Sequence, residues 1–162
     1  MSPRFQRIAP YAWVTQSSLY ATNSGIFLMG REAFLVDPGV TSTELDEIAA
    51  FLTRRRASVR AVVLTHAHWD HLLGPHRFPE ATVIAHERYL DVIARHLSDL
   101  RRQVTTWASD ACLGAWAASF TPPRPDVTFG AGLSLHLGSL RLQVLSAPGH
   151  APDHCVIFEP EE

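Results

Sequence analysis

The most informative part of this sequence is the run Thr65-His66-Ala67-His68-Trp69-Asp70-His71, which follows directly on the apolar run Ala61-Val62-Val63-Leu64. Imidazole and carboxylate groups are ligands for divalent metals such as zinc. On an extended backbone, side chains two residues apart share a face, so His66 and His68 are expected to point the same way. Asp70 and His71 would then reach a second position close by. The run predicts a metal-binding loop at the end of a buried strand.

A second histidine cluster supports this interpretation. The run Ala147-Pro148-Gly149-His150-Ala151-Pro152-Asp153-His154 follows another strand of alternating pattern. Proline and glycine turn the chain and present His150 at a fixed angle. With His66 and His68, His150 would complete a site of three imidazoles with a fourth position open for water. Three protein ligands are typical of catalytic zinc, whereas structural zinc usually has four.

The alternative for any single histidine is a surface or packing role, because the chain has nine histidines in 162 residues. Four potential ligands gathered just past one buried strand favour metal binding over that alternative. His76, His96 and His136 are interpreted as surface or packing histidines. His86 has the same default, although it ends a strand and can lie near the motif loop.

The residues His66-Ala67-His68-Trp69-Asp70-His71, followed by Pro148-Gly149-His150, resemble the HxHxDH and PGH motifs of the metallo-β-lactamase-fold hydrolases. The earlier Val36-Asp37-Pro38-Gly39 is similar to that family's first motif. The resemblance covers roughly Ile8 to Phe158. It implies an α/β protein with the αββα sandwich of that family and a metal site at one edge of its two sheets.

The resemblance also implies a role for each site residue. His66, His68 and His150 would bind a first metal, and Asp70 and His71 a second. Asp70 would also be the catalytic residue that orients the attacking hydroxide. Asp37 would support the histidine loop without binding a metal itself, as carboxylates around metal sites commonly do. The alternative is a purely structural role for Asp37, at the end of a strand before the Pro38-Gly39 turn. For His154, hydrogen bonding beside the site is favoured over ligation.

The function implied is a metal-dependent hydrolase in which a metal-bound hydroxide attacks an ester, thioester, lactone or related bond of a small molecule. The expected cofactor is zinc, as one or two ions, with iron or manganese as alternatives because His and Asp accept all three. A catalytically silent metal-binding or interaction protein is the main alternative. A nuclease or an iron-dependent oxygenase is less favoured, and di-iron relatives usually carry Glu at the position of His68.

The sequence departs from the family after the second cluster. Full-length relatives carry a later Asp and a final His for the metals, but neither residue type follows His154. We therefore expect residues 1–162 to form a single domain that lacks much of the C-terminal half of the sandwich. It would be a fragment, a short form complemented by another chain, or a degenerate relative. Apolar sheet surface left uncovered would favour a homodimer or a complementing chain.

Composition narrows the class of protein. With 46% hydrophobic residues, 19% charged residues and a formal net charge of −2, the chain suits one domain with a core, and nucleic acid is an unexpected partner. The sequence lacks an apolar run of membrane-spanning length and a signal-peptide core, so a cytoplasmic location without membrane contact is expected. Cys112 and Cys155 do not form a disulfide framework, and Cys155 is expected to be buried.

Hydrophobic periodicity predicts alternating strands and helices, typical of an α/β protein. A first helix is expected to be capped by Thr43, and a longer one to run from Glu87 to about Ala118 with a possible break near Ser98-Asp99. An apolar stripe that includes Leu90 would pack this second helix on a sheet. Trp107, Trp116 and Phe120 could instead contact substrate. The expected strands are Ile26–Met29, Ala33–Val36, Val59–Leu64, Ala81–Ala85, Leu133–Leu137, Leu140–Leu145 and Val156–Phe158. The residues Gly138-Ser139 are expected to form a two-residue turn between two of these strands.

Overall fold

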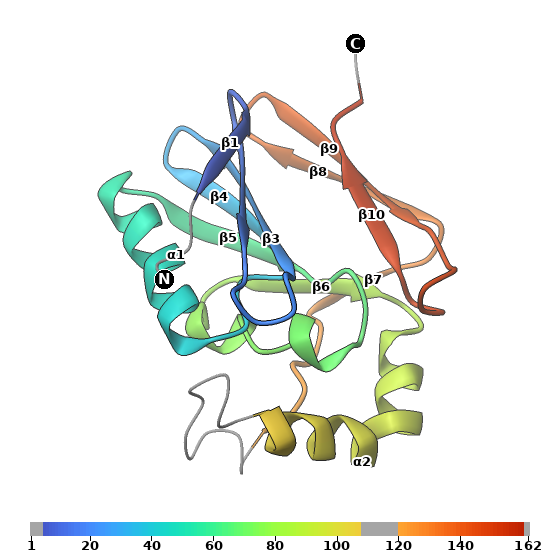
Figure 1. The fold of residues 1–162 in the computed structure, drawn as a ribbon. Helices are drawn as coiled ribbons and strands as arrows, with labels where there is room; N and C mark the ends of the chain where they lie inside the picture. Colours follow the sequence, from blue (N-terminus) through green and yellow to red (C-terminus); the bar gives the residue numbers. More distant parts are fainter. Residues whose placement is uncertain (1–4, 108–119, 161–162) are drawn as a thin grey trace.

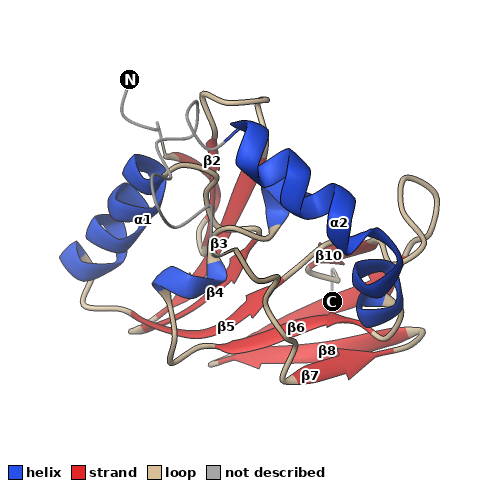
Figure 2. Ribbon diagram, turned by 90° about the horizontal axis from the view of Figure 1, so that it is seen from below, coloured by secondary structure: helices blue, strands red, loops and turns tan. Residues whose placement is uncertain are grey.

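The computed structural model describes residues 5–107 and 120–160. These residues form two β-sheets that lie face to face, with helices on the outer side of the larger sheet (Figures 1 and 2). The helices are α1 (Ser42–Arg54) and α2 (Tyr89–Trp107), with short 3-10 turns η1 (Trp69–His71) and η2 (Pro75–Arg77). The strands are β1 (Gln6–Ala9), β2 (Ala12–Gln16), β3 (Asn23–Met29), β4 (Glu32–Val36), β5 (Ser58–Val63), β6 (Thr82–His86), β7 (Val127–Phe129), β8 (Gly132–Leu137), β9 (Leu140–Ser146) and β10 (Cys155–Phe158).

The larger sheet has the strand order β1-β2-β3-β4-β5-β6-β7. Strands β1 to β4 pair antiparallel, and the β3–β4 hairpin turns at Gly30, whose φ of 61° suits a residue without a Cβ. Strands β4 to β7 are parallel, so their carboxyl ends meet at one edge of the sheet. Asp37, the 65–71 run and His86 are brought to that edge from separate parts of the sequence.

The smaller sheet is the antiparallel meander β10-β9-β8, turned at Gly138 and Ser139 as predicted. Alternate residues of β8 and β9 face the larger sheet, and Leu142 and Val144 pack there against Phe34, Val63 and Ile84. A second core lies between the larger sheet and the helices. The layers are therefore helix, sheet and sheet.

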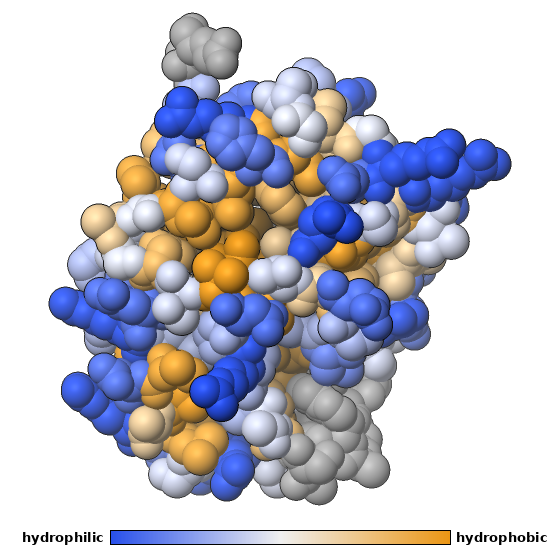
Figure 3. Space-filling model, turned by 180° about the vertical axis from the view of Figure 1, so that it is seen from behind, coloured by the Kyte–Doolittle hydropathy of each residue, from blue (hydrophilic) through white to orange (hydrophobic). Residues whose placement is uncertain are grey.

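The rear of the molecule exposes apolar surface around a hollow (Figure 3). A cavity of about 510 Å³ opens between the sheets, with Phe34 and Ile84 among its lining residues and Glu32 and Arg60 beside them. On the outer face of the smaller sheet, Leu145, Val156 and Phe158 are 38%, 43% and 42% exposed. Association through such surface remains a prediction.

Helix α1 begins two residues earlier than the sequence pattern suggested. The cap is Thr41 and not Thr43, because Thr41 Oγ1 accepts the N–H of Glu44 while the Glu44 carboxylate accepts the N–H of Thr41. This reciprocal capping box requires a Glu three residues after the cap. Glu44 also accepts the Ser17 hydroxyl at 2.8 Å, which ties the helix start to the end of β2.

Helix α2 runs through Ser98 and Asp99 without a break, although it bends along its length (Figures 1 and 2). The predicted stripe is partly wrong, since Leu90 is 44% exposed while Leu100 and Val104 are buried. Neither helix in the described ranges is both long and apolar enough to cross a membrane.

The aromatic residues considered as substrate contacts have packing roles where they are described. Trp107 stacks on Trp69 of η1 with ring centroids 6.4 Å apart, and Phe120 is buried. Trp116 and Cys112 lie outside the described residues. Cys155 is buried, as predicted.

Three short strands, β1, β2 and β7, had no prediction from the sequence. Strand β1 is almost fully exposed and β7 has three residues after a proline-rich segment, so neither shows a clear apolar alternation. Their conformation depends on pairing with β2 and β6.

Candidate metal centre

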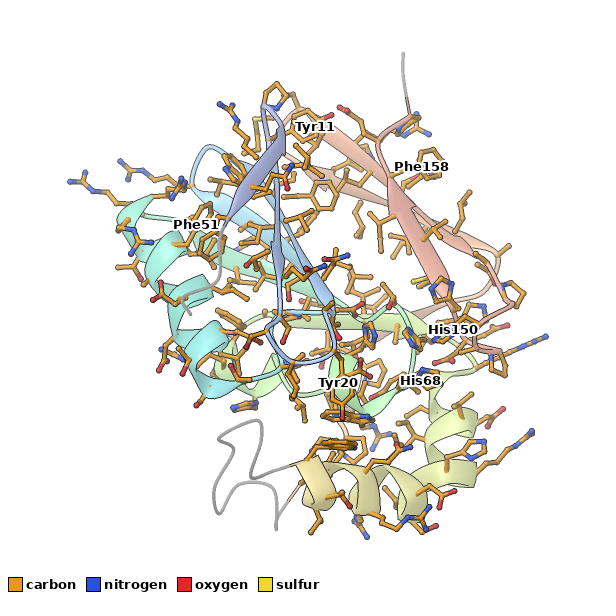
Figure 4. All side chains as sticks on the ribbon, in the orientation of Figure 1. Tyr11, Tyr20, Phe51, His68, His150 and Phe158 are labelled. Atoms are coloured by element: carbon orange, nitrogen blue, oxygen red, sulfur yellow. The ribbon has the colours of Figure 1, made fainter. Side chains whose placement is uncertain are left out.

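The two histidine clusters meet at the edge where the parallel strands of the larger sheet end. His68 follows β5, His150 follows β9, and the two side chains converge from these separate loops (Figure 4). The backbone N–H of Cys155 donates to the carbonyl of Thr65 at 2.9 Å, which fixes the start of β10 against the 65–71 run. Pairing of β10 with β9 therefore holds the His150 loop beside the first cluster.

Three imidazole nitrogens converge in this site. His66 Nε2 lies 2.9 Å from His68 Nδ1, and His150 Nε2 lies 3.1 Å from the same atom. A tetrahedral zinc ion with bonds of about 2.0–2.1 Å holds its ligand nitrogens roughly 3.3 Å apart. The donor set therefore fits one divalent cation with little movement. Within the described ranges, these three residues are the one group of His, Cys, Asp or Glu with such spacing.

Burial and repulsion between neighbouring imidazoles favour the neutral form of two of these ligands, His66 and His68. Burial, followed by the neighbouring imidazoles of His71 and His68, lowers the pKa of His66 to about 2. Burial and then His150 also lower the pKa of His68. Neutral imidazole is the form that binds a metal, so His66 and His68 are ready to bind a cation at neutral pH.

The buried carboxylate of Asp37 holds the histidine loop in place through hydrogen bonds. Its side chain is 4% exposed and accepts the Thr65 backbone N–H at 2.8 Å and the Thr65 hydroxyl at 2.5 Å. Because that hydroxyl proton is donated to Asp37, the 2.9 Å contact between Thr65 Oγ1 and His66 has His66 Nδ1–H as its donor. The relay leaves the lone pair of His66 Nε2 directed at the cluster.

Asp70 and His71 lie together beside this cluster but outside the group of three. Asp70 Oδ2 is 3.6 Å from His71 Nε2 and accepts the Thr22 hydroxyl at 3.0 Å. Burial alone would lower the pKa of His71, but the hydrogen bond to Asp37 and the charges of Asp37 and Asp70 outweigh it, and the pKa is raised. The His71 ring centroid lies 4.1 Å from that of His66, so the pair forms a neighbouring position.

The remaining histidines have other surroundings. His154 Nδ1 donates to the carbonyl of Ala147 at 3.2 Å, and its ring lies 5.3 Å from His66. His86 is buried; its Nδ1 accepts the Arg88 N–H, so its Nε2–H donates to Ser146 Oγ at 3.0 Å. Of the histidines outside the two clusters, His76, His96 and His136 are exposed.

A cavity of about 240 Å³ adjoins the cluster. His68 and His150 line it on one side, and His96, Asp99 and Gln103 of α2 line it on the other. A small molecule in this cavity would lie beside two of the three convergent histidines.

The sequence alone gave no prediction for several residues that support the site. Thr65 could have been noticed because it stands between the apolar strand and the first histidine of the motif. Thr22, from the segment between β2 and β3, carried no signal because only the fold brings it to Asp70. Ser24 accepts the Gly39 N–H and donates to the Asp37 carbonyl, both at 2.8 Å, and so shapes the turn that presents Asp37.

The protein is an α/β protein with three layers: helices, the larger sheet and the smaller sheet. The histidine cluster at the edge of its sheets has the donor atoms and spacing of a metal-binding site. The profile described as "Metallo-beta-lactamase superfamily" matches residues 18–162. The chain belongs to this superfamily, which confirms the resemblance seen in the motifs and the expected fold class. Its members bind divalent metals and include hydrolases, in keeping with the three-histidine cluster.

Individual relatives are distant. An uncharacterized protein of Aquifex aeolicus is 25% identical over 128 residues, which are 79% of this chain and 54% of that protein. A hydroxyacylglutathione hydrolase of Francisella tularensis subsp. novicida is 25% identical over 134 residues, which are 80% of this chain and 39% of that enzyme. The chain thus spans about half the length, or less, of these curated relatives.

Solved structures show the same fold. A metallo-beta-lactamase from Pontibacter korlensis matches with a TM-score of 0.70 at 21% identity, over 98% of this chain and 67% of that one. The FEZ-1 metallo-beta-lactamase from Legionella gormanii matches with a TM-score of 0.69 at 20% identity, over 98% and 58%.

Proposed function

We propose that this protein is a metal-dependent hydrolase that cleaves an ester, lactone or thioester bond of a small molecule. The observation that carries the proposal is the convergence of His66 Nε2, His68 Nδ1 and His150 Nε2 on one point. Similarity to a hydroxyacylglutathione hydrolase favours the thioester among these bonds. The metal is expected to be zinc, with iron or manganese as alternatives.

His66, His68 and His150 would hold one cation, and Asp70 and His71 would offer ligands to a second. A bound divalent cation lowers the pKa of water from about 15.7 toward about 7 and polarises a carbonyl oxygen. The hydrogen bond to Thr65 keeps His66 Nε2 unprotonated, so this nitrogen is ready to bind a cation. Asp37 accepts the Nδ1–H of His71 and leaves Nε2 toward Asp70, but the pKa of His71 is raised, so a second cation would displace a proton from this ring below that pKa.

Asp70 is the proposed catalytic residue. Its Oδ2 is held by the Thr22 hydroxyl, while Oδ1 has no hydrogen bond from the described residues. Oδ1 can therefore accept a hydrogen bond from the attacking water and orient its lone pair toward the substrate carbonyl. The substrate would lie in the cavity of about 240 Å³ beside His68 and His150, against the polar side chains of α2.

The proposal is tested with the 162-residue chain and two matched histidine variants. Metal content is measured by elemental mass spectrometry, and hydrolysis is followed on a 2-hydroxyacyl thioester of glutathione, an aryl ester and a lactone. His68→Ala should lose the metal and at least about 100-fold in kcat/KM, because it removes a ligand. His136→Ala, an exposed histidine on β8, should behave like the wild type. Full metal content and activity in His68→Ala would contradict the proposal.

A catalytically silent metal-binding protein is the second candidate. It is favoured by one observation: only Asp70 and His71 were found, among the described residues, to offer ligands at the second position. In that case the wild-type chain would bind about one cation per molecule and hydrolyse none of the three substrates. Chelator-sensitive turnover would exclude this candidate.

A further inference from the structure

Asp153 is a buried acid that neither the proposed catalysis nor the fold explains. Its side chain is 1% exposed, and neither carboxylate oxygen has a hydrogen-bond partner among the described residues. Burying a polar group without such a partner is energetically unfavourable. A carboxylate in this state points to a donor that it is placed to meet.

The surroundings of Asp153 define which donors are near. Burial raises the pKa of Asp153, while two nearby backbone N–H groups, its own and that of Ala67, and the imidazoles of His68 and His86 act in the opposite direction. Neither backbone N–H has the geometry of a full hydrogen bond to the carboxylate. Asp153 in turn contributes to raising the pKa of Tyr89 and of Cys155, after burial. Four side chains with a donor group therefore lie within its electrostatic reach: His68, His86, Tyr89 and Cys155.

Three of these four donors are already used. The Tyr89 hydroxyl donates to the carbonyl of Pro123 at 2.8 Å, and the Cys155 thiol donates to the carbonyl of Leu64 at 3.7 Å. The His86 Nε2–H donates to Ser146, as described above. His68 is different, because Nδ1 faces the cluster while Nε2 has no hydrogen-bond partner in the described parts of the chain.

We infer that Asp153 is a positioning residue for His68, whose Nε2–H it accepts when Nδ1 binds a cation. A cation on Nδ1 requires the imidazole proton to sit on Nε2, and metal-bound histidines almost always donate that second N–H to a carboxylate, carbonyl or water. His66 already has such support through Thr65 and Asp37. Asp153 supplies the equivalent support to His68, from the loop that also carries His150.

This inference rests on the proposed metal centre, so its test begins with wild-type protein. Zinc affinity is measured by competition with a chromogenic chelator for wild type, Asp153→Asn and Asp153→Ala. Loss of the acceptor should weaken zinc binding about 10–100-fold in Asp153→Ala, with a smaller loss in Asp153→Asn, which keeps a neutral acceptor oxygen. The matched control is Asp126→Asn, an exposed carboxylate that accepts the Val83 N–H at 2.8 Å and should leave the affinity unchanged.

A second measurement does not depend on the folding of a variant. In zinc-loaded wild-type protein with 15N-labelled histidine, the His68 Nε2–H should be visible by NMR and exchange slowly with solvent. Fast exchange of this proton, as expected if Asp153 pairs with the Ala67 N–H instead, would overturn the inference. Equal zinc affinity in wild type and Asp153→Ala would also overturn it. Failure of the wild type to bind zinc would reject the metal centre itself.

Discussion

Nδ1 of His71 lies 2.7 Å from Oδ2 of Asp37, a residue 34 positions earlier in the chain. The same carboxylate accepts two hydrogen bonds from Thr65, so one acid at the end of β4 orients both ends of the 65–71 run. Asp37 has a φ of 45°, a conformation that Asp and Asn tolerate better than most residues. The left-handed turn and the carboxylate together explain why an Asp stands at this position.

Replacing this acceptor should disturb the whole loop. Asp37→Asn keeps the backbone conformation, but its amide cannot accept all three hydrogen bonds of the carboxylate. We expect a loss of about 3 kcal/mol in the free energy of unfolding, because buried donors of Thr65 and His71 lose their partner. Urea unfolding with Asp126→Asn as the exposed control measures this loss. Equal stability of Asp37→Asn and wild type would show that the loop does not depend on this acid.

Thr22 should matter through Asp70 alone. Thr22→Val removes the hydroxyl that holds Asp70 Oδ2 at 3.0 Å while keeping the shape of the side chain. We expect kcat to fall by about tenfold, equivalent to about 1.4 kcal/mol, with little change in the melting temperature. Thr22→Ser retains the hydroxyl and should restore activity. A Thr22→Ser variant as impaired as Thr22→Val would indicate that packing, and not the hydrogen bond, sets the effect.

Gly74 should be irreplaceable because its backbone touches the Asp37-Pro38-Gly39 turn. A Cβ built at Gly74 would lie 1.6 Å from the carbonyl oxygen of Pro38. Gly74→Ala must therefore push the histidine loop away from β4, and we expect it to destabilise the fold by about 3 kcal/mol or more. Gly149→Ala is the matched control, since its Cβ would meet no atom within 4 Å. Thermal unfolding compares the two variants, and equal melting temperatures would disprove the contact.

The metal-free protein should lose stability in mildly acidic solution. The pKa of His66 is lowered from 6.5 to about 2 in the folded protein. Below pH 6.5, His66 therefore binds a proton in the unfolded chain but stays neutral in the folded one. Each such proton lowers the free energy of unfolding by up to about 1.4 kcal/mol per pH unit. His71 acts in the opposite sense: its raised pKa contributes stability that is fully present below pH 6.5 and is lost as the pH rises through the raised pKa of the folded state.

Unfolding of chelator-treated protein between pH 6.5 and about pH 5, above the range where most carboxylates titrate, isolates the histidine contribution. His66→Gln should flatten the decline because it removes a group that titrates only on unfolding. His136→Gln, an exposed position, should keep the wild-type slope. Parallel curves for wild type and His66→Gln would show that His66 is not held neutral by the fold.

The spacing of apolar residues along the chain was enough to predict most of the strands and both helices. The spacing of apolar residues predicted strands near β3, β4, β5, β6, β8, β9 and β10, and it predicted helices in the regions of α1 and α2. The helix cap was predicted wrongly, although Thr41 has the Glu three residues later that a capping box requires and Thr43 has Asp46 there instead. The partner of Glu44 at Ser17, from a different strand, helps select Thr41.

Residue type and spacing alone determined that His66, His68, Asp70, His71 and His150 were the candidates for metal ligation, because few other side chains bind divalent cations and these stand directly after strands. Only the tertiary structure decided how they are grouped and held. The parallel order of β4, β5 and β6 brings Asp37 under the histidine loop, and the pairing of β10 with β9 brings His150 and Asp153 beside His68. The contact between His150 and His68 joins residues 82 positions apart, and no local periodicity records a contact made by the closure of a sheet.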